Sequence, residues 1–309
     1  MKRAGLIIST FDPVNEGHLQ LARVLKEKYG LSEVWFAAVD EDCEADFSNR
    51  YIMLKRALSP RRGWRTVNYA NCRDRKSVLE KLSSAHRSVA FICPGHQTGD
   101  PELGNVTYVT EELNDQAAQV RKGDFRWIGK PVRRYIMEKG LYADSIATEP
   151  LKPHRQLHVR SVARLSAEIA RRNHLDERKA WLAGLYHDIA KDLDDETSLM
   201  YMKLYYPNRL KENRAVWHQF VARRLLERYY RMTDEEILKA VENHCLGEDE
   251  APLSMIIYCA DKLEPLRGYD SSREIELCCR DLKKGFQEVH RQQDAYLLKT
   301  GVKKLPAGS

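Results

Sequence analysis

Six residues in the second half of the chain have side chains of the kind that bind metal ions. They are His158, His187, Asp188, His218, His244 and Asp261. Imidazole nitrogen and carboxylate oxygen suit iron, manganese, zinc or magnesium better than a structural zinc held by thiolates. Each of the six falls in a segment with helical periodicity, so a helical bundle would bring them to one centre in its core. The pattern predicts metal-assisted hydrolysis of a phosphate compound.

Two of these segments place the polar residues directly behind apolar runs. His187 and Asp188 follow the run 181–186, and Asp261 follows the run 255–260. A carboxylate behind such a run is costly to bury unless it is paired or metal-bound. The side chains of neighbouring residues on a helix point about 100° apart. His187 and Asp188 would therefore bind one ion only if it lay at the edge between the two helix faces that they occupy. Lys191, one turn beyond His187, is expected on the same face, where its ammonium can meet a phosphate.

The residues around these positions resemble those of the HD-domain phosphohydrolases. The stretches are 155–158, 183–191, His218, 244–247 and 260–267. More narrowly, they resemble the bacterial symmetrical bis(5'-nucleosyl)-tetraphosphatases, which split diadenosine tetraphosphate (Ap4A) into two ADP. The segment Ala-Asp-Lys-Leu-Glu-Pro-Leu-Arg at 260–267 is the most specific part of the resemblance. It implies that all six residues hold a dinuclear centre, with iron expected first and manganese, zinc and magnesium as alternatives.

The same resemblance implies roles for further residues. Asp188 and Lys191 are expected to be catalytic, in a reaction in which a metal-activated water attacks a phosphorus of the polyphosphate. Arg155, Glu264 and Arg267 are expected to contact the nucleotide. The alternatives are a salt bridge for Arg155 and a pairing of Glu264 with Arg267. The chain departs from the family at Cys245, since threonine usually follows the histidine there.

A second candidate site lies in residues 9–18, which follow the first predicted strand and open the first predicted helix. A helix N-terminus with a glycine and a histidine is a natural cradle for phosphate. This stretch resembles the signature of nicotinate-mononucleotide adenylyltransferases, and residues 47–54 and 123–142 resemble later segments of that family. The resemblance implies a Rossmann-like fold with Asn15 and His18 at a bound nucleotide.

This first half also departs from the adenylyltransferase pattern. Asn15 stands where the first signature histidine is expected, and residues 93–96 replace the family's usual turn. Residues 112–117 are acidic, where the family has a Ser-Ser-Thr-x-x-Ile-Arg phosphate motif. Loss of an imidazole and an arginine aimed at phosphate removes roughly several kcal/mol of transition-state stabilisation. We therefore expect a degenerate unit that is weakly active or inactive, or that is kept for structure or interaction.

The elements that must position these residues divide the chain into two domains. Strands expected at 4–9, 33–39, 87–93 and 106–110 alternate with helices at 18–29, 50–58 and 75–82, which predicts a parallel α/β sheet. Helical periodicity follows at 131–139, 155–172, 177–191, 196–206, 215–230, 234–241, 253–263 and 272–298. Gly30 and Gly140 are expected to end helices, and Thr233 to cap one. We predict an α/β Rossmann-like nucleotidyltransferase-type domain (1–146), a linker (143–152), an all-α HD-domain bundle (151–300) and a frayed tail (303–309).

Composition places the chain among ordinary globular proteins. Its 309 residues are 43% apolar and 31% charged, which argues against disorder and favours two domains. The net charge of +6 fits an anionic small molecule or a mixed solvated surface, and nucleic acid is not the expected partner. Seven cysteines without a CxxC pair favour reduced thiols in a cytoplasmic protein. No apolar run approaches the length of a membrane span.

Four functions are compatible with these patterns. The first is a hydrolase that cleaves Ap4A symmetrically, with a nucleoside polyphosphate as its substrate. The second is a bifunctional enzyme that also forms a dinucleotide from ATP and nicotinate mononucleotide. The third is an HD hydrolase of another nucleotide. The fourth is a binding module, in which the first domain senses a nucleotide or docks a partner. The sequence leaves a homodimer open.

Overall fold

The computed structural model describes residues 2–59, 61–68 and 72–300, and the expected frayed tail at 303–309 lies outside these ranges. Two compact units make up the chain, Met1–Tyr142 and Ala143–Ser309. The segment expected to be a linker is instead partly helical, because α6 spans Ala143–Thr148 and packs against the helices of the second unit. None of the described helices is both long and apolar enough to cross a membrane.

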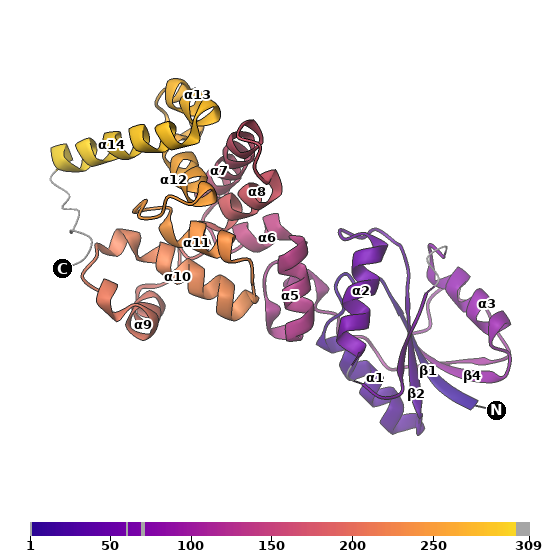
Figure 1. The fold of residues 1–309 in the computed structure, drawn as a ribbon. Coiled ribbons are helices and arrows are strands. Elements are labelled where there is room, and N and C mark those ends of the chain that lie inside the picture. The colour runs from indigo at the N-terminus through magenta and orange to yellow at the C-terminus, as the bar shows by residue number, and fades with distance from the viewer. Residues whose placement is uncertain (1, 60, 69–71, 301–309) are drawn as a thin grey trace. The chain divides into compact units, whose positions relative to one another are not determined.

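The first unit is built on a five-stranded parallel sheet with the order β3-β2-β1-β4-β5. Its strands are β1 (Lys2–Ser9), β2 (Glu33–Ala38), β3 (Trp64–Val67), β4 (Val89–Pro94) and β5 (Val106–Val109). Helices α1 (Glu16–Tyr29) and α2 (Phe47–Leu58) cover one face of the sheet, and α3 (Arg75–Ala85) covers the other (Figure 1). The predicted parallel α/β fold is confirmed. Strand β3 was missed because Arg65 and Thr66 interrupt its short apolar pattern between Trp64 and Val67.

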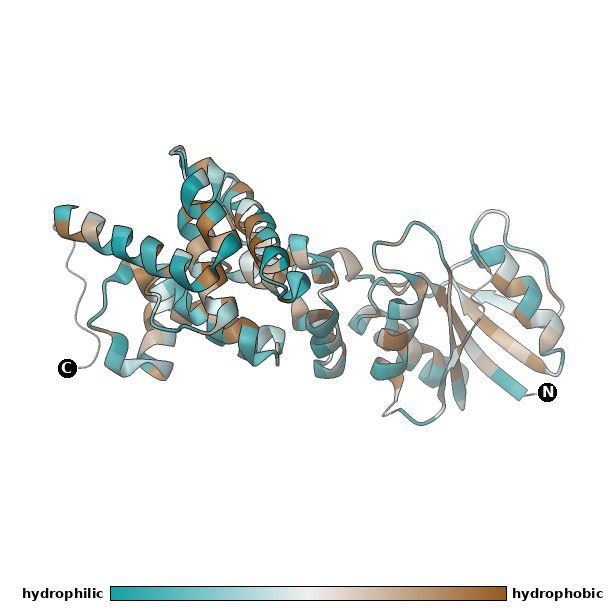
Figure 2. Ribbon diagram, turned by 45° about the horizontal axis from the view of Figure 1, so that its top comes forward, coloured by the Kyte–Doolittle hydropathy of each residue, from teal (hydrophilic) through white to brown (hydrophobic). Residues whose placement is uncertain are grey.

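The central strands are apolar because helices cover both of their faces. Leu6, Val34, Phe36 and Phe91 are fully buried, and the strands of this unit carry long brown stretches in Figure 2. The strand order reverses at β1, which lies between β2 and β4. In open parallel sheets, ligands bind beyond the carboxyl ends of the strands at such a point. The loop after β1 therefore occupies the position where a nucleotide would be expected.

Short helices complete the first unit. They are α4 (Ala117–Arg121), η1 (Phe125–Trp127) and α5 (Lys130–Lys139). Gly30 and Gly140 end α1 and α5 in the left-handed conformation, with φ of 61° and 55°. Both expected helix ends are confirmed, because glycine adopts this conformation without a steric penalty.

All the regular elements among the described residues of the second unit are helices. Its elements after α6 are α7 (Pro153–Arg172), α8 (Glu177–Tyr186), α9 (Asp195–Tyr205), η2 (Pro207–Arg209), η3 (Arg214–Val216), α10 (Trp217–Leu225), η4 (Leu226–Tyr230), α11 (Glu235–Asn243), α12 (Pro252–Leu263), η5 (Pro265–Arg267), α13 (Ser272–Arg280) and α14 (Leu282–Thr300). Helices α7 and α8 approach closely at Gly184, where an added Cβ would lie 2.7 Å from the Cα of Ala163. This close contact brings the end of α8 beside the first turns of α7.

Three expectations about helices in this unit were wrong, and a fourth helix has the expected bounds but a varying geometry. The helix expected at 272–298 is two helices, because Asp281 is extended with φ −151° and ψ 93°. The helix expected at 215–230 changes geometry twice, from 3-10 to α to π. Asp234, not Thr233, caps α11, since its carboxylate accepts the backbone N–H groups of Glu236 and Ile237. The helix expected to reach residue 191 ends at Tyr186.

Candidate metal centre

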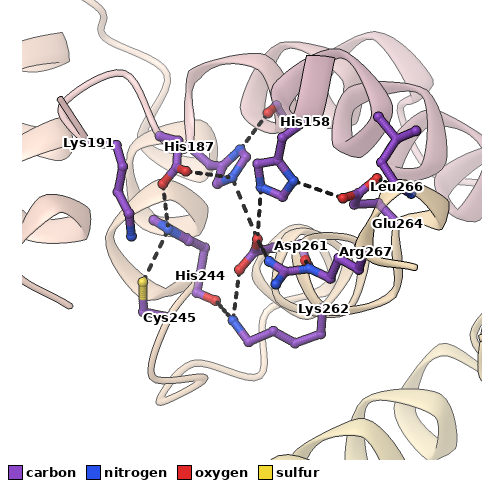
Figure 3. A network of polar contacts seen from close by, with 12 residues as sticks. His158, His187, Lys191, His244, Cys245, Asp261, Lys262, Glu264, Leu266 and Arg267 are labelled. Carbon is purple, nitrogen blue, oxygen red and sulfur yellow. Dashed lines mark hydrogen bonds and ion pairs between the residues drawn. The ribbon is translucent and has the colours of Figure 1, made fainter. Parts of the chain in front are cut away.

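The structure brings all six predicted metal-ligand residues to one place in the helical unit. His158 lies on α7, His218 on α10 and Asp261 on α12, while the other three follow the ends of α8 and α11. In Figure 3 the side chains of His158, His187, His244 and Asp261 point toward one another. All six are buried except His158, whose side chain is 18% exposed. Residues more than a hundred positions apart thus form one polar cluster in an apolar bundle.

His187 and Asp188 lie in a turn rather than in a helix. The turn starts where α8 ends, and the backbone N–H of Lys191 donates to the carbonyl of Asp188 at 2.8 Å. The backbone of His187 is still helical, with φ −56° and ψ −38°, and Asp188 Oδ2 lies 3.8 Å from His187 Nε2. Lys191 extends to His218, with its Nζ 3.1 Å from Nε2.

Backbone carbonyls fix the orientation of two imidazoles. His187 Nδ1 lies 2.7 Å from the carbonyl of Gly184, and His244 Nδ1 lies 2.7 Å from the carbonyl of Val241. Because a carbonyl only accepts, each Nδ1 carries the proton and each Nε2 keeps its lone pair. Nε2 of His187 is buried and has no hydrogen-bond partner among the described residues. An unpartnered nitrogen lone pair inside a cluster of carboxylates fits a bound cation.

Glu264 orients a third imidazole. Its Oε1 lies 3.0 Å from His158 Nδ1, and its Oε2 accepts the N–H of Leu266 at 2.8 Å. The side chain is 2% exposed, so it faces the cluster rather than solvent. No side-chain hydrogen bond or ion pair between Glu264 and Arg267 is found among the described residues, although the backbone N–H of Arg267 donates to the carbonyl of Glu264 at 3.2 Å. A carboxylate behind an imidazole raises the basicity of the nitrogen that faces the metal.

Replacing Glu264 with methionine should weaken metal binding about 10- to 100-fold, because partners of this kind orient metal-ligating histidines. Glu264→Gln keeps an acceptor for His158 and should lose less. Titration of the metal-free protein with zinc, followed by calorimetry, measures the change. The surface variant Glu276→Met serves as a control, and equal affinities for Glu264→Met and this control would refute the role.

The donor atoms fall into two groups that share Asp188. His158, His187 and Asp188 form one group, and His218, His244 and Cys245 form the other, with the donor atoms of each within 4.8 Å of one another. Asp261 Oδ1 joins the first group at 3.2 Å from His158 Nε2. Asp188 Oδ1 reaches the second group at 3.0 Å from His218 Nε2. One carboxylate therefore lies between two sets of ligand-type atoms.

The electrostatics of the cluster affect its ligand-type residues in different ways. Burial lowers the pKa of His187 to about 3, so this imidazole is neutral near pH 7. Burial opposes ionisation of Asp261, but Lys262, His158 and Arg267 outweigh it and hold the pKa of Asp261 well below its usual value. Burial lowers the pKa of His158, but hydrogen bonds to Asp261 and Glu264 outweigh it and raise the pKa. Since a cation must displace that proton, metal binding should weaken as the pH falls.

Cationic side chains surround the mouth of the cluster. A cleft of about 410 Å³ opens over it and is lined by His154, Arg155, His158, Asp188, Lys191, His218, His244, Cys245, Asp261, Glu264, Leu266 and Arg267. Arg155 lines this cleft and also pairs with Asp192 at 3.1 Å, so the salt bridge foreseen as its alternative is present. Arg267 donates to Asp261 Oδ1 at 2.6 Å, and its side chain remains 38% exposed.

The two candidate residues of the first unit lie in internal hydrogen bonds. Asn15 caps α1, accepting from Gly17 N at 3.1 Å and donating to Asp115 at 2.6 Å. His18 is fully buried, with Nδ1 3.3 Å from the N–H of Asn15 and Nε2 3.0 Å from the hydroxyl of Ser9. Burial lowers the pKa of His18 to about 4, so it is neutral near pH 7. The predicted nucleotide contacts would require both side chains to face an open surface, and neither of them does.

Residues 114–116 cover the expected phosphate cradle. Gln116 Oε1 accepts the N–H of Gly17 at 3.0 Å, and a Cβ at Gly17 would lie 1.7 Å from the carbonyl oxygen of Asn114. The N–H groups at a helix N-terminus are the ones that bind phosphate. A side-chain amide and a backbone carbonyl therefore fill this place, and the acidic segment 112–117 supplies both.

Comparison with known proteins gives a consistent result. Residues 155–266 match the HD domain family. The chain is 32% identical over 171 residues to a Mycoplasma pneumoniae protein named probable nicotinate-nucleotide adenylyltransferase/Ap4A hydrolase, covering 53% of this chain and 49% of that one. It is 28% identical over 155 residues to a Bacillus subtilis protein named symmetrical bis(5'-nucleosyl)-tetraphosphatase, covering 49% of this chain and 83% of that one.

A further relative is a Halalkalibacterium halodurans protein named probable nicotinate-nucleotide adenylyltransferase. It is 28% identical, with 46% of this chain and 92% of that one covered. The matched part of the chain spans about half the length of the Mycoplasma relative. The resemblance inferred from the sequence is confirmed, because the second unit contains an HD domain and the relatives carry both names.

Proposed function

Because residues 155–266 form an HD domain, we propose that this chain hydrolyses Ap4A symmetrically to two ADP in a metal-dependent reaction. The observation that carries the proposal is the set of four imidazoles and two carboxylates, all buried except His158, beneath a cleft with cationic side chains. The Bacillus relative's name supports a symmetrical dinucleoside tetraphosphate as the substrate. The positive side chains around the cleft suit a polyphosphate chain, which carries several negative charges.

Each residue of the cluster has a role in this proposal. His158, His187, Asp188, His218, His244 and Asp261 would hold a dinuclear metal centre, with iron expected first, and Asp188 would also act in catalysis. When bound, such ions polarise phosphoryl oxygens and activate water near neutral pH. Lys191, whose Nζ lies beside His218, offsets the negative charge that develops on the phosphoryl oxygens. Arg155 and Arg267, which line the cleft, contact the nucleotide, while Glu264 holds His158 in position.

Product identification tests the reaction. The purified chain, analysed first for bound metal, is incubated with Ap4A and the nucleotides are separated by chromatography. We expect ADP as the single nucleotide product, loss of activity after chelation and recovery on adding metal. Formation of AMP and ATP would overturn symmetrical cleavage. If Ap4A stays intact while another nucleoside polyphosphate is hydrolysed, the metal-dependent hydrolase stands and its substrate must be reassigned.

A second candidate activity is adenylyl transfer in the first unit, which the names of the Mycoplasma and Halalkalibacterium relatives favour. The covered cradle at the N-terminus of α1 counts against it, since residues 114–116 would have to leave before a triphosphate could bind. Pyrophosphate release from ATP and nicotinate mononucleotide measures this activity. We expect none above a protein-free control, and sustained release would make the chain bifunctional.

A further inference from the structure

We propose that Cys245 is an additional, sulfur ligand of the metal centre, on the side of His218 and His244. The inference rests on the metal site of the proposed function and extends it to a residue outside the six. Figure 3 shows the thiol of Cys245 directed at the imidazole of His244. Its Sγ lies 3.2 Å from His244 Nε2 and 3.3 Å from His218 Nε2.

The spacing of these atoms is that of ligands around one ion. The two Nε2 atoms are 3.1 Å apart, and Asp188 Oδ1 lies 3.0 Å from one and 3.6 Å from the other. With metal–nitrogen bonds of about 2.0–2.1 Å and metal–sulfur bonds of about 2.3 Å, neighbouring ligands of one ion are about 2.9–3.6 Å apart. Two nitrogens, one sulfur and one oxygen thus form a set suited to a borderline-soft ion.

The backbone also holds Cys245 in this position. Its N–H donates to Gln219 Oε1 at 3.0 Å, and Gln219 is fully buried next to His218 on α10. Gln219 follows His218 and Cys245 follows His244, so this hydrogen bond holds together the segments that carry two candidate ligands. When an ion binds, the S–H bond breaks, the sulfur–metal bond forms and the proton passes to solvent. A thiolate ligand makes the site softer, which favours zinc or iron over manganese and magnesium.

Cobalt(II) substitution tests the proposal without relying on activity. Metal-free full-length protein is titrated with cobalt(II) alone, and its absorption spectrum is recorded. A sulfur-to-cobalt charge-transfer band in the near ultraviolet is expected for the wild type and for Cys43→Ser, a control in the first unit. The band should disappear in Cys245→Ser, while the visible bands of bound cobalt remain.

Other results separate this proposal from the metal centre on which it rests. Visible bands without the charge-transfer band in the wild type, or persistence of that band in Cys245→Ser, would overturn sulfur ligation and leave the centre intact. Failure of the wild type to bind cobalt would overturn the centre and the proposal together. As a second measurement, the ratio of the affinities for zinc and manganese should fall at least about tenfold in Cys245→Ser. Substitutions at metal sites typically change affinity on this scale. An unchanged preference counts against the proposal.

Discussion

Asp188→Asn is expected to remove most bound metal and to lower kcat/KM for the hydrolysis by about 10³-fold or more. Asp188 is the carboxylate shared by the two donor groups, 3.0 Å from His218 Nε2 and within 4.8 Å of the donor atoms of His158 and His187. Asparagine keeps the shape of the side chain but lacks its negative charge. A loss of this size corresponds to about 4 kcal/mol of transition-state stabilisation, within the range supplied by metal ions and fixed charges.

The measurement for Asp188→Asn combines metal analysis of the purified variant with steady-state hydrolysis at saturating metal. Asp195→Asn is the matched control, because Asp195 is 86% exposed on α9 and does not line the cleft. It should keep wild-type metal content and activity. Full metal content and activity in Asp188→Asn would contradict the assignment of the centre, whatever the substrate is.

The second large effect is expected in the first unit, where Arg50→Met should lower the free energy of unfolding by about 3–5 kcal/mol. Arg50 is not among the predicted site residues, and its guanidinium is fully buried. It donates to the carbonyls of Thr10, Val39 and Ala45 at 2.5, 2.7 and 2.9 Å and pairs with Asp40. Methionine fills similar space but leaves these buried acceptors without a donor.

Urea unfolding, monitored by hydrogen exchange in residues 2–58, measures this loss. The exchange of these residues reports the stability of the first unit alone. Arg56→Met, on the same helix and 38% exposed, is the control and should cost about 0–1 kcal/mol. Metal content of the second unit should stay unchanged in both variants. A loss below about 1 kcal/mol for Arg50→Met would mean that water replaces the guanidinium as donor. The loop after β1 would then not depend on it.

The covered phosphate cradle and the metal cluster indicate that the two units differ in their capacity to bind a ligand. In the first unit, internal partners satisfy Asn15, His18 and the N–H of Gly17. In the second unit, a buried imidazole nitrogen of His187 has no hydrogen-bond partner among the described residues. A buried polar atom without a hydrogen-bond partner is stabilised by binding a ligand, whereas an atom that already has a partner gains nothing from one. The hydrolase site is therefore the better place to test activity first.

The sequence by itself determined the chemistry of the ligands and the types of the elements. Imidazole and carboxylate donors are properties of side chains, and their flanking residues identified the HD domain before any contact was known. Alternating strands and helices determined the parallel sheet, because covering both faces of a sheet requires apolar strands. Local patterns carry this information, since each depends on residues only a few positions apart.

Tertiary structure alone decided how the polar groups are partnered. His158 meets Glu264 across 106 positions, and Asn15 meets Asp115 across 100, so no local pattern could indicate either pair. The turn at 187–192 interrupts a helical pattern and sends Lys191 to His218, while Cys245 comes within reach of two imidazoles. These arrangements depend on how helices pack, because the position of a side chain in a core is set by neighbours distant in the chain.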